Sequence, residues 1–369
     1  MRERLAHLHN FSIYAGAALL WLTTTAMHIP DGYLGPVFSA AMFVLVLPFW
    51  AAGMRSIRVN MDARNIPLIA LLAAFSFVIM MFNVPLPGGT SGHAVGAALA
   101  GIILGPAAAT IALSIALIIQ ALFFGDGGIL ALGANCFNMA VVVPYVAAGL
   151  YGLLTRNASA TSCRRVIGAA LGGWLGLTLA ALLAGVEFGL QPVLSHSPDG
   201  APLYAPYSLG IAIPAMVLPH AAVASIIEGL LTALVIAYLQ RTNLPILNTA
   251  EIRAEGRGES SRRTLRWLVI VLAVLVVASP LGLLAPGTAW GEWGRAELVQ
   301  HGLGSIPAGM EQLPGLWGAP LANYQVHALG NASLGYMLSG ALGVVVVGVL
   351  TWLFTSLLAP THPARSNGH

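Results

Sequence analysis

The sequence predicts an all-α integral membrane protein, with a seven-helix bundle followed by a two-helix unit. Two observations predict this class. Of its 369 residues, 57% are hydrophobic and only 8% are charged, whereas a soluble domain carries roughly 25% charged residues. The apolar residues also fall in runs long enough to cross a bilayer, with short polar loops between them. The chain is therefore expected to cross a membrane several times.

Residues 1–26 have the three-part pattern of a secretory signal peptide. Two arginines give a basic start, a short apolar core follows, and Thr24-Thr25-Ala26 supplies a small-residue end. We expect cleavage after Ala26, which makes Met27 the mature N-terminus. The alternative is a retained signal anchor, because Thr at the third position before the cut is acceptable but not ideal.

Seven apolar spans are expected in residues 27–240. Six have the length of a membrane crossing, and the shorter 93–105 is a crossing only where the bilayer is thin or protein shelters the helix. Several spans are rich in Gly and Ala, which suits close packing within the bundle or a face for a partner membrane subunit. The expected spans are 34–53, 66–82, 93–105, 107–124, 138–155, 166–188 and 208–238.

A polar, Arg-rich stretch follows and indicates a cytoplasmic linker at 241–264. Two further apolar runs then predict an accessory unit at 265–358 with two crossings. The unit has crossings near 266–284 and 334–356 and an external loop at 287–330. A C-terminal tail at 359–369 follows it.

The distribution of arginine orients the chain, because cytoplasmic loops of membrane proteins carry an excess of basic residues. Three loops hold most of the arginines. When 93–105 is counted as one crossing, all three of these loops lie on the cytoplasmic side. Met27 and the loop 83–92 then lie outside. We therefore expect the cell inner (plasma) membrane, with the mature N-terminus outside and the C-terminus in the cytoplasm.

Two histidines indicate a metal site on the outer face. His28 directly follows the predicted cleavage site, and His93 follows a Gly-rich segment. The free amine of Met27 and the backbone nitrogen and imidazole of His28 can chelate one metal ion through fused rings. His93 can supply a fourth nitrogen, and four nitrogens in a plane suit Ni(II) or Cu(II).

Five other polar residues are candidates for a supporting or pathway role: Asp31, Asp126, Asn135, His220 and Glu228. Asp31 could hydrogen-bond the N-terminal ammonium or an imidazole, and Asp126 and Asn135 could cover the site. His220 and Glu228 lie at membrane depth, where ionisable groups are functional suspects, and a spacing of eight places them on one helix face. The plainer alternative for Asp31 and Asp126 is a turn or cap carboxylate. For His220 and Glu228 it is a polar pair whose hydrogen bonds are satisfied within the bundle.

Several enzyme classes find no support in the sequence. No lysine is present, so the chain cannot carry the Lys-containing phosphate-binding loop of ATPases, and any ATP-driven function needs another subunit. The metalloprotease H-E-x-x-H and hydrolase G-x-S-x-G motifs are also missing. We expect a protein that is not itself an enzyme.

These motifs resemble the substrate-capture component of nickel/cobalt energy-coupling factor (ECF) transporters (NikM/CbiM). The resemblance covers about 27–240 and is most specific in the octapeptide MHIPDGYL. The tail is similar to the PDGLE-like accessory subunit (NikN/CbiN) fused behind. The matching segments are 27–34, 89–93, 124–135 and 219–228, and in the tail 278–285 and 287–293.

The resemblance implies a capture protein that binds Ni²⁺ or Co²⁺ as substrate through Met27, His28 and His93, without an organic cofactor. It also implies a separate transmembrane coupling protein and cytoplasmic ATPase subunits. Pro30-Asp31 is nearer the nickel branch, so we favour nickel. One departure is that the motif begins at residue 27, so a retained leader would block the amine. Alternatives are an ATP-independent metal permease or channel, and a metal-sensing membrane scaffold.

Overall fold

The computed structural model describes residues 28–61, 65–87, 90–241, 259–285, 290–291, 293, 298–299 and 305–359. The predicted signal peptide and Met27 lie outside the described residues. So do residues 242–258 of the predicted linker and residues 360–369 of the predicted tail.

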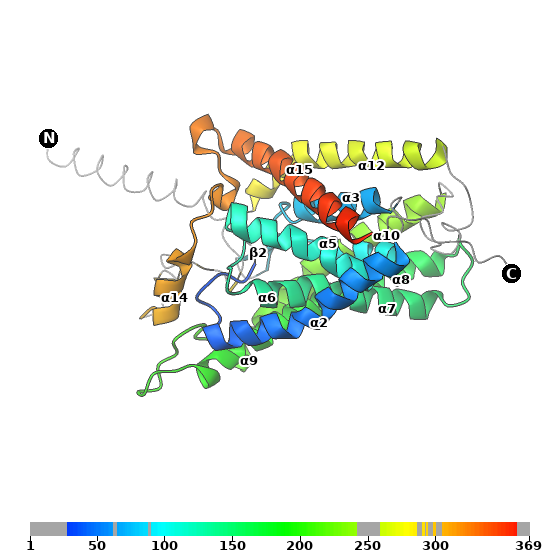
Figure 1. The fold of residues 1–369 in the computed structure, drawn as a ribbon. Coiled ribbons are helices and arrows are strands. Elements are labelled where there is room, and N and C mark those ends of the chain that lie inside the picture. Colours follow the sequence, from blue (N-terminus) through cyan, green and yellow to red (C-terminus); the bar gives the residue numbers. More distant parts are fainter. Residues whose placement is uncertain are drawn as a thin grey trace.

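The part of the chain that precedes the linker folds into a helical bundle (Figure 1). Each predicted apolar span coincides with a helix, and three of the long helices contain a π-helical turn. The elements are α2 (Pro36–Asn60), α3 (Ile66–Ile79), α4 (Ala97–Leu104), α5 (Pro106–Ile119) with η1 (Gln120–Phe124), α6 (Leu132–Asn135) with η2 (Cys136–Val142) and α7 (Val143–Thr155), α8 (Cys163–Leu194), and α9 (Leu209–Pro219) with η3 (His220–Ala224) and α10 (Ser225–Arg241).

A short hairpin interrupts the helices and, with an isolated β-bridge between His196 and Pro202, departs from the all-α fold among the described residues. Strands β1 (Val84–Leu86) and β2 (Thr90–Gly92) pair antiparallel, with Val84 opposite Gly92. Pro85 and Pro87 each lack a backbone N–H and disfavour continuation of the helix, which fits the extended segment that follows α3. The hairpin matters for the site because His93 follows β2 directly.

Six helical segments of the described residues are long and apolar enough to span a membrane. Helix α4 has eight residues and is thus about 12 Å long, well short of a hydrocarbon core of roughly 30 Å. The structure therefore supports a multi-pass helical membrane protein, while the predicted count of seven plus two crossings remains a prediction. The six segments are Pro36–Asn60, Pro106–Phe124, Leu132–Thr155, Cys163–Leu194, Leu209–Arg241 and Ala332–Leu358, with shorter apolar helices at Ile66–Ile79 and Leu268–Leu284.

Close packing of the bundle depends on glycines at helix contacts. A Cβ atom on Gly172 of α8 would lie 2.9 Å from the carbonyl oxygen of Ala147 in α7, and one on Gly173 would lie 3.0 Å from the Cα of Gly229 in α10. Absence of a side chain lets the helix backbones approach closely. These small residues are thus used within the chain.

The accessory unit packs against the same bundle. Helices α12 (Glu259–Ala278) and α15 (Ala332–Leu358) lie beside α3 (Figure 1). Helix α12 begins six residues before the predicted unit, because the Arg-rich end of the linker is compatible with a helix. The other described elements of the accessory unit are η5 (Ser279–Leu284), α14 (Ala308–Gln312), η6 (Leu313–Leu316), η7 (Ala322–Tyr324) and η8 (His327–Leu329).

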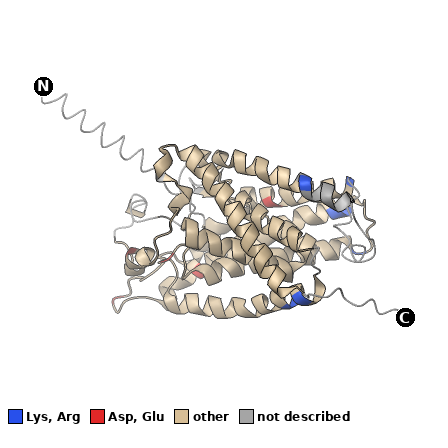
Figure 2. Cartoon of the chain, turned by 45° about the horizontal axis from the view of Figure 1, so that its top comes forward, with Lys and Arg blue, Asp and Glu red and all other residues tan. Residues whose placement is uncertain are grey.

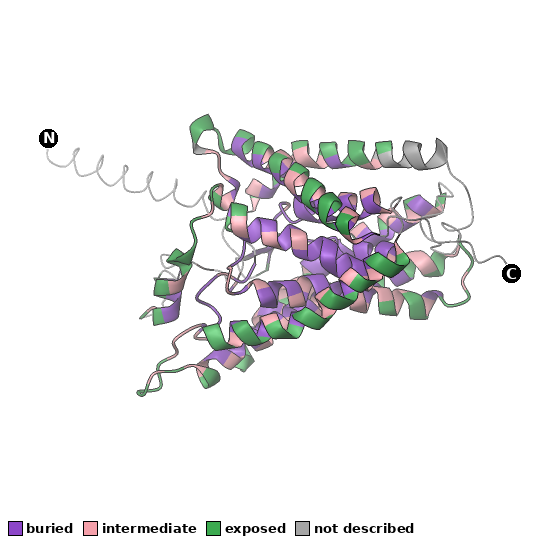
Figure 3. Ribbon diagram, in the orientation of Figure 1, coloured by how far each residue is buried: buried purple, intermediate pink, exposed green. Residues whose placement is uncertain are grey.

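The surface has the pattern of a protein surrounded by lipid. Exposed positions lie on the outer sides of the helices and buried ones between them (Figure 3), and large apolar side chains are exposed on α2 and α15. Basic residues gather at one end of the bundle, whereas the acidic residues lie mostly toward the other end (Figure 2).

Candidate metal site

Main-chain hydrogen bonds fix the segment that follows His28. The backbone N–H of Ile29 donates to Oδ1 of Asn135 (3.1 Å), and Nδ2 of Asn135 donates back to the Ile29 carbonyl (3.0 Å). The N–H of Gly128 donates to the same carbonyl (2.9 Å). Asn135, expected to cover the site, thus anchors the backbone next to His28.

Asp31 ties the same segment to the start of α6. Its carboxylate accepts hydrogen bonds from the backbone N–H groups of Ile129 (3.0 Å), Leu130 (2.8 Å) and Ala131 (3.3 Å). Burial raises the pKa of Asp31, and these N–H groups act in the opposite direction. The structure thus gives Asp31 the cap role, which was one of its two predicted alternatives.

The loop before α6 closes on His28 because of a glycine. Gly127 has φ +89°, and a Cβ atom there would lie 3.0 Å from Cβ of His28. A left-handed φ and so close an approach both favour glycine. The turn brings Asp126 beside the buried His28 ring, with Oδ1 3.1 Å from Nδ1.

This contact bears on the tautomer of the His28 ring. A carboxylate can only accept, so Nδ1 of His28 donates to Asp126, and in the neutral ring Nε2 then carries the lone pair. Nε2 of His28 is buried and has no hydrogen-bond partner among the described residues. A carboxylate behind an imidazole in this way is the usual support of a histidine metal ligand.

The second predicted ligand, His93, lies beside the first. The His28 and His93 ring centroids are 5.2 Å apart and the rings are nearly perpendicular, at 89°. Nδ1 of His93 donates to the Ala94 carbonyl (3.0 Å), which leaves its Nε2 as an acceptor. His93 lies outside the spanning helices, and burial, with a smaller effect of His28, lowers its pKa to about 4. The neutral imidazole is the form that binds metals.

Glu228 supports the chain just after His93 and does not line the cavity. Its carboxylate accepts hydrogen bonds from the backbone N–H groups of Val95 (2.8 Å), Gly96 (2.8 Å) and Ala98 (3.0 Å) at the start of α4. It is fully buried inside the chain. Glu228 holds the backbone that carries His93.

His220 reaches the cavity from the π-helical turn η3. Its Nδ1 donates to the Met216 carbonyl (2.7 Å). His220 and Glu228 have different neighbours, since His220 lines the cavity and Glu228 accepts hydrogen bonds from the start of α4. That they share one helix face remains a prediction. The other π-helical turns also carry residues near the site, Gln120 in η1 and Asn138 and Met139 in η2, as is common for such turns.

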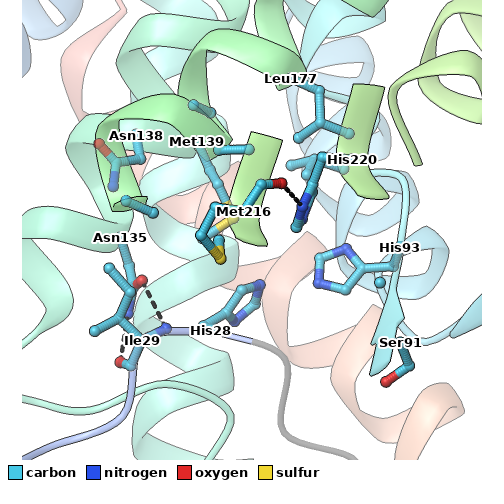
Figure 4. Close-up of a pocket in the computed structure, with 15 residues that line it drawn as sticks. His28, Ile29, Ser91, His93, Asn135, Asn138, Met139, Leu177, Met216 and His220 are labelled. Atoms are coloured by element: carbon cyan, nitrogen blue, oxygen red, sulfur yellow. Dashed lines mark hydrogen bonds between the residues drawn. The ribbon is translucent and has the colours of Figure 1, made fainter. Parts of the chain in front are cut away.

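One cavity joins these residues. Figure 4 shows the rings of His28, His93 and His220 around it, with Met216 beside them. Its volume is about 70 Å³, enough for an ion and a few waters. Within the described residues, no group of three or more His, Cys, Asp or Glu side chains is placed to hold a metal ion. The polar residues that line the cavity are His28, Ser91, His93, Asn135, Asn138 and His220.

Three further buried residues near the site were not predicted from the sequence. Glu187 lies in α8, where Nδ2 of Asn138 donates to its carboxylate (3.0 Å), and a carboxylate within an apolar span was a usable signal. Gln120 and Tyr324 bond to Asp126 and to each other. No local pattern pointed to Tyr324, because it lies in a loop of the accessory unit.

Comparison with known proteins places the chain in a family. Residues 28–245 match the family model CbiM, described as the cobalt uptake substrate-specific transmembrane region. This chain belongs to the CbiM family. Membership makes it a transmembrane component of metal uptake, and residues 264–360 match the PDGLE domain.

Named relatives match half of the chain or more. The fused nickel transport protein NikMN of Rhodobacter capsulatus is 50% identical over 352 residues, which cover 92% of this chain and 100% of that protein. The cobalt transport protein CbiM of Moorella thermoacetica is 36% identical over 193 residues, or 52% of this chain and 74% of that protein.

Two solved structures have similar folds. A crystal structure of a transition metal transporter is 47% identical with a TM-score of 0.56 and covers 62% of this chain and 100% of that one. A truncated transition metal transporter is 49% identical with a TM-score of 0.55, over 58% of this chain and 99% of that one. Both correspond in extent to the CbiM part.

Proposed function

We propose that the chain is the substrate-capture component of an ATP-driven, ECF-type importer and that it binds Ni²⁺, or Co²⁺, at the outer face. The observation that carries the proposal is the pairing of His28 and His93, two buried imidazoles with centroids 5.2 Å apart on one cavity. Family membership supports the same function, as does the printed name of the Rhodobacter relative, a nickel transport protein.

The proposed ligands are the amine of Met27, the backbone nitrogen and imidazole of His28, and the imidazole of His93. Removal of residues 1–26 frees the amine. Fused rings require Nδ1 of His28, because Cα, Cβ and Cγ link it to the backbone nitrogen in a six-membered ring. In the structure Nδ1 faces Asp126, so this chelate also requires a half-turn of the ring about Cβ–Cγ.

Nickel is the favoured substrate. Four nitrogen donors in one plane suit Ni(II), whereas oxygen ligands in an octahedron suit Mg²⁺ and Ca²⁺. Asp31 and Glu228 accept main-chain hydrogen bonds, so neither competes to supply oxygen. His220 and Asn138 line the same cavity and are proposed to assist the ion on its way through.

The partners belong to the proposal. The sequence contains no lysine and so no phosphate-binding loop, so ATP hydrolysis is assigned to separate ATPase subunits and its coupling to a separate membrane protein. The Arg-bearing end of the bundle is the proposed cytoplasmic side in the inner membrane. The cavity then opens toward the outside, near the mature N-terminus.

Native mass spectrometry of the purified protein tests this function. The protein is exposed to equal Ni²⁺ and Co²⁺, beside His28→Ala and His93→Ala variants. We expect a chain that begins at Met27 with one nickel bound, and no metal on either variant. A full-length chain without metal, or undiminished metal on a variant, would contradict the four-nitrogen site.

A further inference from the structure

We propose that Tyr324 of the accessory unit is a positioning residue of the metal site, which holds Asp126 so that Asp126 orients the His28 ring. The inference rests on the proposed function, because it takes His28 to be a metal ligand. It assigns the fused accessory unit a direct structural part in metal capture.

A continuous hydrogen-bonded chain carries the proposal. The hydroxyl of Tyr324 donates to Oδ2 of Asp126 (2.6 Å), and Nε2 of Gln120 donates to the Tyr324 oxygen (3.0 Å). The other carboxylate oxygen of Asp126 lies 3.1 Å from Nδ1 of His28. Tyr324, Asp126 and His28 are each at most 2% exposed. Hydrogen bonds to an ionised group in so dry a setting are short and strong.

The accessory loop holds Tyr324 firmly. The Tyr324 ring stacks on Phe124, with centroids 4.8 Å apart and planes 17° from parallel. Two hydrogen bonds fasten the loop to the end of η1, from the Leu321 N–H to the Phe123 carbonyl (2.9 Å) and from Trp317 Nε1 to the Leu122 carbonyl (2.8 Å).

The backbone of the loop is itself unusual. Tyr324 has φ +59°, a left-handed conformation that is uncommon for a bulky side chain and persists only where the surroundings impose it. The surroundings here are the aromatic stack and the polar contacts of Tyr324. Segments held in such conformations cluster at functional sites.

The geometry of imidazole explains how Asp126 orients the ring. Each long edge of the ring carries one nitrogen, and a half-turn about Cβ–Cγ exchanges the edges. A carboxylate against one edge therefore holds the protonated nitrogen there and leaves the lone pair on the opposite edge, toward the metal. In the structure Asp126 lies against Nδ1. In the fused chelate the half-turn brings Nε2 to this edge of the ring, and a small shift of the Asp126 carboxylate lets Nε2–H donate to it. Asp126 contacts His28 through Oδ1 and Tyr324 through Oδ2. A carboxylate with both oxygens engaged is a better-fixed acceptor than one that contacts His28 alone.

A matched pair of variants tests the inference in the purified full chain. Tyr324→Phe removes the hydroxyl and keeps the ring. Tyr336→Phe is the control, because Tyr336 is equally buried and packs against the Tyr324 ring, while its hydroxyl donates to the Met81 carbonyl (2.8 Å). Ni²⁺ affinity is measured by competition with a coloured chelator, together with the absorption spectrum of the bound ion and the melting temperature without metal.

We expect Tyr324→Phe to bind Ni²⁺ about tenfold more weakly, at the low end of the effect of outer partners of a ligand, and with an altered spectrum. Tyr336→Phe keeps the parent affinity, and the two variants melt at similar temperatures. Adding Tyr324→Phe to Asp126→Asn costs little further affinity, because Tyr324 acts through Asp126. The inference would be overturned if Tyr324→Phe had the same affinity and spectrum as the Tyr336→Phe control, or bound Ni²⁺ more tightly. A full additional loss of affinity in the double variant would overturn it as well.

His28→Ala, measured in the same series, separates the two proposals. Loss of Ni²⁺ from His28→Ala with unchanged binding by Tyr324→Phe overturns only the role of Tyr324. Retention of Ni²⁺ by His28→Ala overturns the proposed site itself.

Discussion

Glu228 shows how a buried carboxylate can serve a site that it does not touch. It accepts three backbone N–H groups just after His93, and Asp31 does the same just before α6. Asn135 makes a two-way contact with the Ile29 backbone. Buried polar groups are stable where their hydrogen bonds are satisfied. Here they fix the two segments that carry the histidines.

A single change at Glu228 tests this role. In Glu228→Gln an amide NH₂ replaces one acceptor oxygen and leaves at least one buried N–H without a partner. We expect a loss of about 1–3 kcal/mol in stability, seen as a lower melting temperature in detergent, and weaker Ni²⁺ binding because the His93 segment moves. Glu311→Gln, at an exposed position, is the control and should melt as the parent does. Equal melting and binding for both variants would contradict the supporting role.

At the scale of helices, backbone irregularities place side chains on the cavity. The π-helical turns η1, η2 and η3 carry Gln120, Asn138 and His220, and a wider turn shifts the register of everything that follows. Glycines then let helices α7, α8 and α10 approach closely. Helix packing thereby sets the width of the cavity.

Two glycine variants separate packing from helix propensity. In Gly172→Val the new side chain meets the Ala147 carbonyl, since Cβ alone would lie 2.9 Å from it, whereas nothing lies within 4 Å of a Cβ at Gly149. We expect Gly172→Val to lose about 1–3 kcal/mol through overpacking and Gly149→Val to remain near the parent in thermal unfolding. An equal effect of both would indicate that the α7–α8 contact is looser than the structure has it.

At the scale of the whole molecule, charge and hydropathy have the distribution of a membrane-embedded bundle. Exposed apolar side chains surround it, and basic residues gather at one end (Figures 2 and 3). The accessory unit packs along the same bundle and reaches Asp126 through Tyr324. Both units therefore contribute to one buried hydrogen-bond network around Asp126.

Cysteine labelling tests that orientation. Cys163 is exposed at the start of α8, next to Arg164 and Arg165, and Cys136 is buried. If the Arg-bearing end is cytoplasmic, a membrane-impermeant maleimide labels Cys163 in inside-out vesicles but not in intact spheroplasts. A Cys163→Ser, Asp199→Cys variant moves the thiol to an exposed loop beyond the other end of α8 and reverses the pattern. Labelling of Cys163 in intact spheroplasts would contradict the proposed topology.

The sequence by itself determined the membrane class, the positions of the helices and the two histidines of interest. Hydropathy and arginine content are local properties, so they can be read along the chain without knowing which helices touch. The same reasoning expected a crossing at 93–105, where the structure has the eight-residue helix α4. Regular periodicity also could not reveal the π-helical turns.

Only the tertiary structure decided what the polar residues do. The carboxylate of Asp31 meets N–H groups about a hundred positions away, and Tyr324 meets Asp126 across 198 positions. A hydrogen bond acts only at contact distance, near 3 Å, so its partner depends on how distant segments pack. Asp31, Asp126, Asn135 and Glu228 could be recognised as polar residues in unusual places, but their partners followed from the fold.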